Sequence, residues 1–396
     1  MNLLVLAVLV VASSEAAPDP ELVAAHTGAS LVDVSNRLVF GLRWWRPVVR
    51  TGIFREVGTS FGTPAVSVKH GLIIVGSGEG DVRALAVTDG GVRWIYRHGI
   101  PFEGAVSLVQ HRGSELAVLG SRDGTLLVLE AQSGKLRFKV TLEGDPRAPA
   151  VQDSDRLLVT TAANKIAAVA LKDGKLLWMR GRPVPSKLTV AGHARPAVGQ
   201  GRVFATYADG YAEAYDLDDG ATLWSRPLSL AGGDFVDADA DPVLSGAHLF
   251  VASYTDGVYA LNPADGHTVW RRAAPAVVAL APYKDLMVVA SADGFVWGLG
   301  RTDGRVAYRT KLPAGSGSRM TVRDDLVAFS GGDSGLIVLA AKNGRPLQAM
   351  GLGSMVASAP AWSGDDLAVL STSGYVFALR RGSRGGVRRG LGRDRV

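Results

Sequence analysis

Residues 241–270 read DPVLSGAHLFVASYTDGVYALNPADGHTVW and contain the most complete copy of a repeated unit. Two Asp-Gly pairs, Asp256-Gly257 and Asp265-Gly266, separate short runs of alternating apolar and small residues. Asp-Gly between such runs predicts a tight hairpin turn, because glycine adopts a positive φ without a Cβ clash. We therefore expect four short antiparallel strands, the last of which begins at Thr268. Such a meander cannot bury both of its faces alone, so neighbouring copies must cover them.

The same unit recurs along the chain at a spacing of about 42 residues, which is typical of propeller blades. Each copy is marked by its second hairpin, in which a turn that ends in glycine is followed by a strand. We call the residue of this strand at which the marker ends the closing residue. Seven such markers end at residues 94, 138, 178, 224, 270, 308 and 348. An eighth copy begins at Pro360 and stops at Leu379, before its fourth strand.

The missing strand lies at the other end of the chain. Leu42–Val48 (LRWWRPV) is similar to the segment that begins at Trp224 (WSRPL), with Trp44 at the position of Trp224. Pairing this strand with the eighth copy would close a ring and remove the free sheet edges. We predict an all-β fold, an eight-bladed β-propeller of four-stranded antiparallel blades over residues 42–379, in which the N-terminal strand completes the last blade. An open β-solenoid would leave Leu42–Val48 without a partner.

An aromatic residue closes most of the copies. In a propeller, a large ring at a fixed position of every copy is more typical of packing between adjacent blades than of a ligand cage, and each ring buries roughly 150–250 Å². We therefore assign blade packing to the following residues: Trp44, Trp94, Phe138, Trp178, Trp224, Trp270 and Tyr308.

The two ends of the chain differ from its body. Leu3–Ala12 is a continuous apolar run that is too short to span a bilayer comfortably, and it fits a secretory signal peptide over residues 1–16, although no Lys or Arg precedes it. Residues 17–41 are predicted to be a loose segment. Residues 380–396 form an Arg/Gly-rich tail that we predict to be disordered. The tail is either simply solvated or a peripheral contact for anionic lipid.

Charge and cysteine content exclude several classes of function. The tail holds seven Arg and one Asp, which equals the formal net charge of +6, so residues 1–379 have no net charge. The body is therefore not a basic nucleic-acid-binding surface. The chain has no Cys, which excludes disulfides, thiolate metal sites, Cys nucleophiles and a lipid-modified N-terminal Cys.

The repeat resembles a known family. The pattern A-L-x-x-x-D-G-x-x-x-W is similar to the pyrroloquinoline-quinone-type (PQQ-like) propeller repeat of quinoprotein dehydrogenases and of non-enzymatic proteins. Over residues 42–379 the chain most resembles the BamB family of outer membrane protein assembly factors. The resemblance implies a non-enzymatic scaffold in the periplasm, without a cofactor. It would assist insertion of β-barrel proteins by contacting the periplasmic domain of a BamA-like protein. A second binding hypothesis is that the propeller holds unfolded outer membrane proteins by β-augmentation.

The resemblance extends to a loop before the fourth repeat. Residues 184–192 (VPSKLTVAG) correspond to a Leu-x-Leu-Arg-Gly stretch through which the family contacts BamA. Leu188 and Val190 match the two apolar positions, whereas Ala191 stands in place of the arginine. The substitution removes a bidentate hydrogen-bond donor. The resemblance thus implies that Leu188 and Val190 bind the partner.

A second loop, before the fifth repeat, also matches. Residues 237–242 (DADADP) correspond to the family's Asp-x-Asp-x-x-Pro, whose two acids lie at the same interface. Asp237 and Asp239 are therefore implied as partner-binding residues. The same spacing begins a calcium loop, but Pro242 and His248 occupy the positions where such a loop has Gly and Glu. We favour a docking loop over a metal site.

Two other classes of function stay open from the sequence. A PQQ-dependent quinoprotein dehydrogenase would share the repeat, but it typically needs a vicinal Cys pair and a calcium-binding set that we do not find. A ligand-sensing propeller would need an aromatic platform outside the packing positions. Residues 332–335 (GDSG) resemble a protease motif but fall where other copies have a turn. The seven histidines show no metal-ligand spacing and are predicted to be surface or turn residues.

Overall fold

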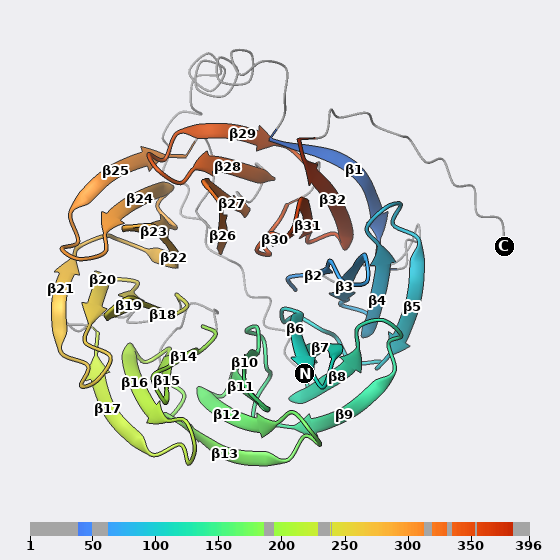
Figure 1. Cartoon of the computed structure of the whole chain (residues 1–396), viewed down its shortest axis with the longest axis horizontal. Helices are drawn as coiled ribbons and strands as arrows, with labels where there is room; N and C mark the ends of the chain where they lie inside the picture. The colour runs from blue at the N-terminus through green and yellow to red at the C-terminus, as the bar shows by residue number, and fades with distance from the viewer. Residues whose placement is uncertain are drawn as a thin grey trace, which may run out of the picture.

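The computed structural model describes residues 39–49, 62–185, 194–228, 238, 240–312, 319–330, 335–352 and 355–382. These residues form eight four-stranded antiparallel sheets arranged as blades around a central axis, which confirms the predicted eight-bladed propeller (Figure 1). Within the same residues there is no helix long and apolar enough to cross a membrane.

Each blade is a sequential meander, and the eighth is shared between the two ends of the chain. The strands of blades 1 to 4 are β2 (Ala65–Ser67), β3 (Leu72–Gly76), β4 (Asp81–Ala86) and β5 (Val92–Arg97); β6 (Ser107–His111), β7 (Ser114–Gly120), β8 (Thr125–Glu130) and β9 (Leu136–Thr141); β10 (Val151–Asp153), β11 (Arg156–Thr161), β12 (Lys165–Ala170) and β13 (Leu176–Gly181); β14 (Ala197–Gly199), β15 (Arg202–Thr206), β16 (Tyr211–Asp216) and β17 (Thr222–Pro227). Those of blades 5 to 8 are β18 (Val243–Ser245), β19 (His248–Ser253), β20 (Gly257–Leu261) and β21 (Thr268–Arg272); β22 (Val277–Tyr283), β23 (Leu286–Ser291), β24 (Phe295–Gly300) and β25 (Val306–Lys311); β26 (Met320–Arg323), β27 (Leu326–Ser330), β28 (Leu336–Ala340) and β29 (Pro346–Met350); β30 (Ala361–Ser363), β31 (Asp366–Leu370), β32 (Tyr375–Arg381) and β1 (Phe40–Pro47).

The meander gives the ring two distinct faces. In every blade the first strand lies beside the axis and the fourth lies at the rim (Figure 1). Because successive strands are antiparallel, the connections from each outer strand to the next inner strand all lie on one face, which we call the loop face. The turns between third and fourth strands, most of them Asp-Gly, lie on the opposite face, which we call the turn face.

The N-terminal strand closes the ring as predicted. β1 pairs with β32 from Phe40↔Arg381 to Pro47↔Tyr375, and Gly382 N donates to Val39 O at 3.0 Å. Both strands extend two residues beyond the predicted limits of 42 and 379, because Arg380 and Arg381 continue the ladder instead of belonging to the tail. The chain therefore enters and leaves the ring on the turn face.

The closing aromatic residue of one blade lies against the glycine in the turn between the third and fourth strands of the next blade. The Trp94 indole Nε1 donates to Ala131 O at 3.1 Å, and a Cβ added to Gly134 would lie 2.5 Å from the Trp94 ring. Gly134 also has a φ of +71°, so both its conformation and its close contact require glycine. The same close approach of ring to glycine joins Trp44 to Gly90, Phe138 to Gly174, Trp178 to Gly220, Trp224 to Gly266, Trp270 to Gly304 and Tyr308 to Gly344.

The boundary between blades 7 and 8 is built differently. The closing position of blade 7 is Gln348, which is 3% exposed. Its Nε2 donates to Phe40 O at 2.8 Å, and its Oε1 accepts from Phe40 N at 2.8 Å. Blade 8 has no turn between its third and fourth strands, because they come from opposite ends of the chain. The amide of Gln348 therefore binds backbone where the other blades bind a turn.

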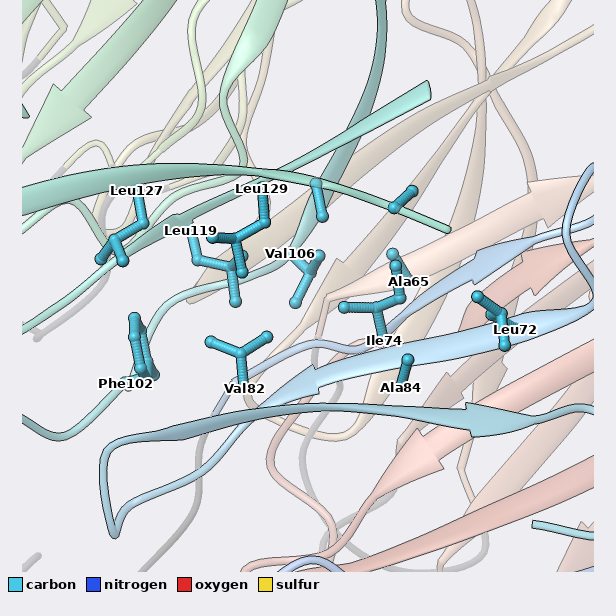
Figure 2. Close-up of a cluster of buried hydrophobic side chains, with 12 residues drawn as sticks. Ala65, Leu72, Ile74, Val82, Ala84, Phe102, Val106, Leu119, Leu127 and Leu129 are labelled. Carbon is cyan, nitrogen blue, oxygen red and sulfur yellow. The ribbon is translucent and has the colours of Figure 1, made fainter. Parts of the chain in front are cut away.

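The core lies between adjacent blades. Figure 2 shows the cluster between blades 1 and 2, in which Ile74 and Val82 face Leu119 and Leu127, with Phe102 from the connection between the blades. Burying a large apolar side chain of this kind contributes about 1.5–3 kcal/mol. Because every blade shares its core with two neighbours, the ring provides a rigid frame for the loops on its faces.

Candidate partner-docking face

The two predicted docking loops leave the ring at neighbouring places on the loop face. One connects β13 to β14 and the other connects β17 to β18. Leu188 and Val190 in the first, and Asp237 and Asp239 in the second, lie outside the described residues. The residues at the bases of both loops are described, and they define the candidate site.

Arg182 begins the first loop and is held by blade 4. Its Nη1 donates to Glu213 Oε1 at 2.7 Å, its Nε donates to Asp209 Oδ2, and its guanidinium carbon lies 3.7 Å from the centre of the Tyr211 ring. Ion pairs with two carboxylates and a stacked aromatic ring fix the planar guanidinium in orientation as well as in position.

Asn164 adds a second attachment for the first loop. Its Nδ2 donates to Pro183 O at 3.1 Å, and its Oδ1 accepts from Ala208 N at 3.2 Å. The amide therefore links the start of the loop to the turn between β15 and β16. Val184, directly after these contacts, is 60% exposed.

Glu213 is the centre of a buried polar network beneath the loops. It is 6% exposed, accepts from Ser225 Oγ at 2.7 Å as well as from Arg182, and accepts from the Tyr215 hydroxyl. The Tyr215 and Tyr207 hydroxyls are 2.7 Å apart. Burial, followed by the hydrogen bond to Glu213, raises the pKa of Tyr215, and burial likewise raises that of Tyr207. Both phenols therefore stay protonated at neutral pH, and the network keeps one arrangement.

The second loop is anchored to the same turn. At its start, Leu228 N donates to Gly210 O at 2.8 Å, and the Tyr259 hydroxyl donates to Leu228 O at 2.5 Å. Near its end, Ala238 N donates to Tyr207 O at 3.4 Å, and Ala238 is 1% exposed. Residues 206–210 of blade 4 thus hold parts of both loops.

Asp241 joins the ends of the two loops directly. Its Oδ1 accepts from Arg195 N at 2.9 Å, and its Oδ2 lies 3.1 Å from Arg195 Nε. Arg319, which directly precedes the inner strand of blade 7, places Nη1 at 4.0 Å from Asp241 Oδ1. The last residues of the first loop are therefore tied to the last residues of the second.

Few of these anchors could be recognised from the sequence. Arg182 and Arg195 bind groups in another blade or connection, and Tyr207 O accepts from Ala238 N of the following connection. Glu213 is the one that a sequence signal could have identified, because it is a carboxylate at a third-strand position where the other copies have Arg83, Leu127, Ala167, Tyr259, Trp297, Ile337 and Phe377.

The prediction that the histidines are surface or turn residues is wrong for His111. This side chain is 5% exposed at the end of β6, and its Nδ1 lies 3.3 Å from Asp155 Oδ1 of blade 3. Burial follows from its place on the inner strand of blade 2, which the repeat spacing alone does not reveal. Among the described residues, no group of three or more His, Asp or Glu side chains is placed to hold a metal ion. Residues 332–334 lie outside the described part of the chain.

A family model described as outer membrane protein assembly factor BamB matches residues 78–255 and 234–384. The chain belongs to the BamB family. The match covers most of the ring, including the anchored bases of both docking loops. No curated protein matches the sequence.

Solved structures share the fold of this BamB-family chain. BamB from Moraxella catarrhalis has a TM-score of 0.74 at 22% identity, covering 86% of this chain and 100% of that chain. The computationally designed Ika8 protein has a TM-score of 0.66 at 16% identity, covering 82% and 97%. The quinohemoprotein alcohol dehydrogenase ADHIIG from Pseudomonas putida HK5 has a TM-score of 0.65 at 12% identity, covering 90% and 78%. At these identities the likenesses describe the fold.

The residues that line the central channel can be compared with those that a quinone cofactor would need in this BamB-family ring. A cavity of about 550 Å³ on the axis is lined mainly by inner-strand residues such as Val198 and Leu280. Its described lining offers one carboxylate, Asp241, which is paired with Arg195. A calcium ion takes about six to eight oxygen ligands. The described residues therefore do not fit a calcium-bound quinone.

Proposed function

We propose that the protein is a non-enzymatic periplasmic scaffold that assists assembly of β-barrel proteins into the outer membrane. Its partner would be the periplasmic domain of a BamA-like protein, bound on the loop face. Membership of the BamB family supports the class of function. The proposed position of the partner-binding surface is supported by the Arg195–Asp241 pair. This pair ties together the ends of the two loops that hold the predicted partner-binding residues.

The anchored bases give the proposed interface its physical basis. Leu188 and Val190 would bury apolar surface against the partner, and Asp237 and Asp239 would pair with basic groups on it. A well-buried anchor of this kind contributes about 2 kcal/mol or more to binding. Because the network around Glu213 already fixes both loop bases, less conformational entropy is lost when the loops bind.

A pull-down from a membrane extract tests the proposal. The bait is the tagged protein carrying Leu188→Asp with Asp237→Lys, and the expected result is loss of a barrel-assembly partner that the unmodified protein retains. The matched control, Val68→Asp with Asp285→Lys, makes the same chemical changes on the turn face, where Val68 is 62% exposed and the Asp285 side chain is fully exposed.

Circular dichroism and thermal melts show whether each bait is folded. Equal retention of the partner by the docking variant and the control would place the interface elsewhere on the ring. Absence of any barrel-assembly partner from the unmodified bait would contradict the scaffold function itself.

A further inference from the structure

The outer strands of the ring carry charge of one sign. Together β1, β5, β9, β13, β17, β21, β25 and β29 contain twelve Lys and Arg residues and no Asp or Glu. Residues 1–379 have no net charge, so the remainder of the body is correspondingly acidic. Charge is therefore separated between the rim and the rest of the propeller.

Part of this basic rim has a structural role. Four arginines at matching positions donate to backbone carbonyls in the Asp-Gly turn of the next blade. The pairs are Arg46 to Asp89 O at 3.3 Å, Arg180 to Gly220 O at 2.9 Å, Arg226 to Asp265 O at 3.5 Å and Arg272 to Gly304 O at 2.8 Å. These contacts explain one basic residue in each of four outer strands.

The basic residues of blades 1 and 2 do not make these contacts. Arg93 and Arg97 on β5, and Arg137 and Lys139 on β9, are exposed. Within the part of the chain that the structure describes, no hydrogen bond or ion pair joins the side chains of Arg93, Arg97 or Lys139 to another residue. Arg137 lies 3.4 Å from Glu130 at the surface, a pair of small energetic worth.

Exposed aliphatic side chains gather on the same strands. Nine of the twelve large hydrophobic residues that are exposed in the described chain lie on outer strands. Five of the nine lie on three consecutive outer strands, and they are Val92, Ile95, Leu136, Leu176 and Leu177. We call β5, β9 and β13 the basic rim arc. They follow one another around the rim, one in each of three consecutive blades (Figure 1).

We infer that the basic rim arc rests on the surface of a bilayer containing anionic phospholipid. Guanidinium and ammonium groups would meet the lipid phosphates, and the neighbouring aliphatic side chains would enter the boundary between headgroups and acyl chains. Uniform charge also discourages pairing between exposed sheet edges, but this purpose does not explain the exposed aliphatic residues. An acidic polypeptide would fit the charge, whereas single aliphatic side chains spread over three blades suit a continuous apolar layer better than a partner with fixed pockets.

The proposed contact between the basic rim arc and the bilayer does not depend on the proposed function. The ring would stand edge-on, with its loop face and turn face both free of the bilayer. The arc ends at β13, and β13 leads directly into Arg182 and the first docking loop. A protein bound through the arc would therefore present its docking loops beside the membrane surface.

Vesicle flotation with the full mature protein tests the inference. Vesicles of phosphatidylcholine mixed with phosphatidylglycerol are compared with phosphatidylcholine alone. Arg93→Glu with Lys139→Glu is expected to lower partitioning onto the anionic vesicles on the order of 25-fold, about fivefold for each basic residue. Arg305→Glu with Lys311→Glu makes the same change in net charge on blade 6 and is expected to lower it by less than about threefold.

A second pair of variants leaves the charge unchanged. Leu136→Ser with Leu177→Ser removes two aliphatic side chains from the arc, and Leu223→Ser with Val269→Ser removes two from blades 4 and 5, where the exposure is similar. Weaker flotation of the first pair alone supports insertion of the arc. Thermal melts confirm that all variants are folded, and the Arg/Gly-rich tail is present in every protein, so its contribution cancels.

Three results would overturn the inference. The first is that the unmodified protein does not float with anionic vesicles. The second is that both charge-reversal pairs, or both serine pairs, lose flotation equally, which would indicate diffuse attraction rather than a defined arc. The third is that soluble polyglutamate binds through Arg93 and Lys139 while vesicles do not, which would identify an acidic polypeptide as the partner.

Discussion

Two blade boundaries of this ring are held together by different kinds of side-chain contact. Between blades 4 and 5, the Trp224 indole packs on Gly266 and its Nε1 donates to Pro263 O at 3.1 Å. Between blades 7 and 8, the amide of Gln348 binds both backbone polar groups of Phe40. An aromatic ring needs a turn to pack on, and blade 8 has no such turn because its last two strands come from opposite ends of the chain.

The comparison also separates architecture from function. At the boundary of blades 7 and 8, the hydrogen bonds of Gln348 satisfy the backbone that closes the ring. Around blade 4, the network of Arg182, Glu213 and Tyr215 lies in addition to the aromatic contacts that close the neighbouring boundaries. A buried charged network that closure does not require indicates a second purpose, which we assign to holding the docking loops.

The largest effect is expected at the aromatic boundary. Trp224→Ala removes a side chain that is 8% exposed and leaves a cavity beside Phe204, so the free energy of unfolding should fall by about 3–5 kcal/mol. Denaturant unfolding monitored by circular dichroism measures it. A loss smaller than that of the Gln348 variant below would show that the aromatic contacts do not dominate ring closure.

A smaller loss is expected where the chain ends meet. Gln348→Ala leaves the backbone N–H and C=O of Phe40 without their buried partners, which should cost about 2–3 kcal/mol. Gln348→Trp tests the reason for this difference between the two boundaries. If a turn is what an aromatic ring needs, Trp at this position should destabilise the ring by at least as much as Ala. Full stability of the Trp variant would contradict the explanation given for Gln348.

The network around blade 4 should affect stability less and binding more. Glu213→Gln keeps the shape but removes the charge that pairs with Arg182, and we expect a loss of about 1–2 kcal/mol in the free energy of unfolding. Capture of the partner from membrane extract should also weaken, because the base of the first loop loses its ion pair. Gln348→Ala provides the control, since it should leave capture unchanged at a temperature where both variants are folded.

The smallest expected effect is on how the free energy of unfolding depends on pH. It arises at a third boundary, between blades 2 and 3. Burial raises the pKa of the Asp145 carboxyl above its ordinary value of 3.8, although Arg147 donates to it at 2.7 Å and opposes the rise. A carboxyl group with a higher pKa in the folded state stabilises the fold while protonated. This contribution is fully present below the unfolded-state pKa and is lost as pH rises through the folded-state pKa.

Asp145→Asn removes that titration. The unfolding free energy of the unmodified protein, relative to the variant, should therefore fall as pH rises through the acidic range. Denaturant titrations at a series of acidic pH values measure the difference. A relative stability that rises with pH would show that the ion pair with Arg147 outweighs burial.

The fold could be predicted because its signals are local and repeated. Asp265-Gly266 followed by Trp270 identifies a hairpin within a single copy, and the spacing of the copies gives the ring. The partner of each aromatic residue was beyond sequence reasoning, because Trp224 packs on a glycine of the next blade. The role of Gln348 depends on Phe40, which lies 308 residues away and becomes its neighbour only when the ring closes.

The candidate site was less predictable for the same reason. The four predicted partner-binding residues came from a resemblance, and they lie outside the described residues. The groups that hold their loops, such as Arg182, Asn164 and Tyr207, have side chains of ordinary turn and strand residues. Their importance comes from contacts between blades, which no spacing along one copy encodes. Glu213 alone departs visibly from its repeat position.

Site-specific photo-cross-linking in membranes tests the docking face most directly. A photoreactive residue at position 184 replaces Val184 at the exposed base of the first loop, and a second protein carries it in place of Val68 on the turn face, where exposure is nearly the same. We predict that position 184 forms a cross-link to the periplasmic domain of a barrel-assembly protein and that position 68 does not. A cross-link to that protein from position 68, with none from position 184, would contradict the assignment of the loop face as the docking surface.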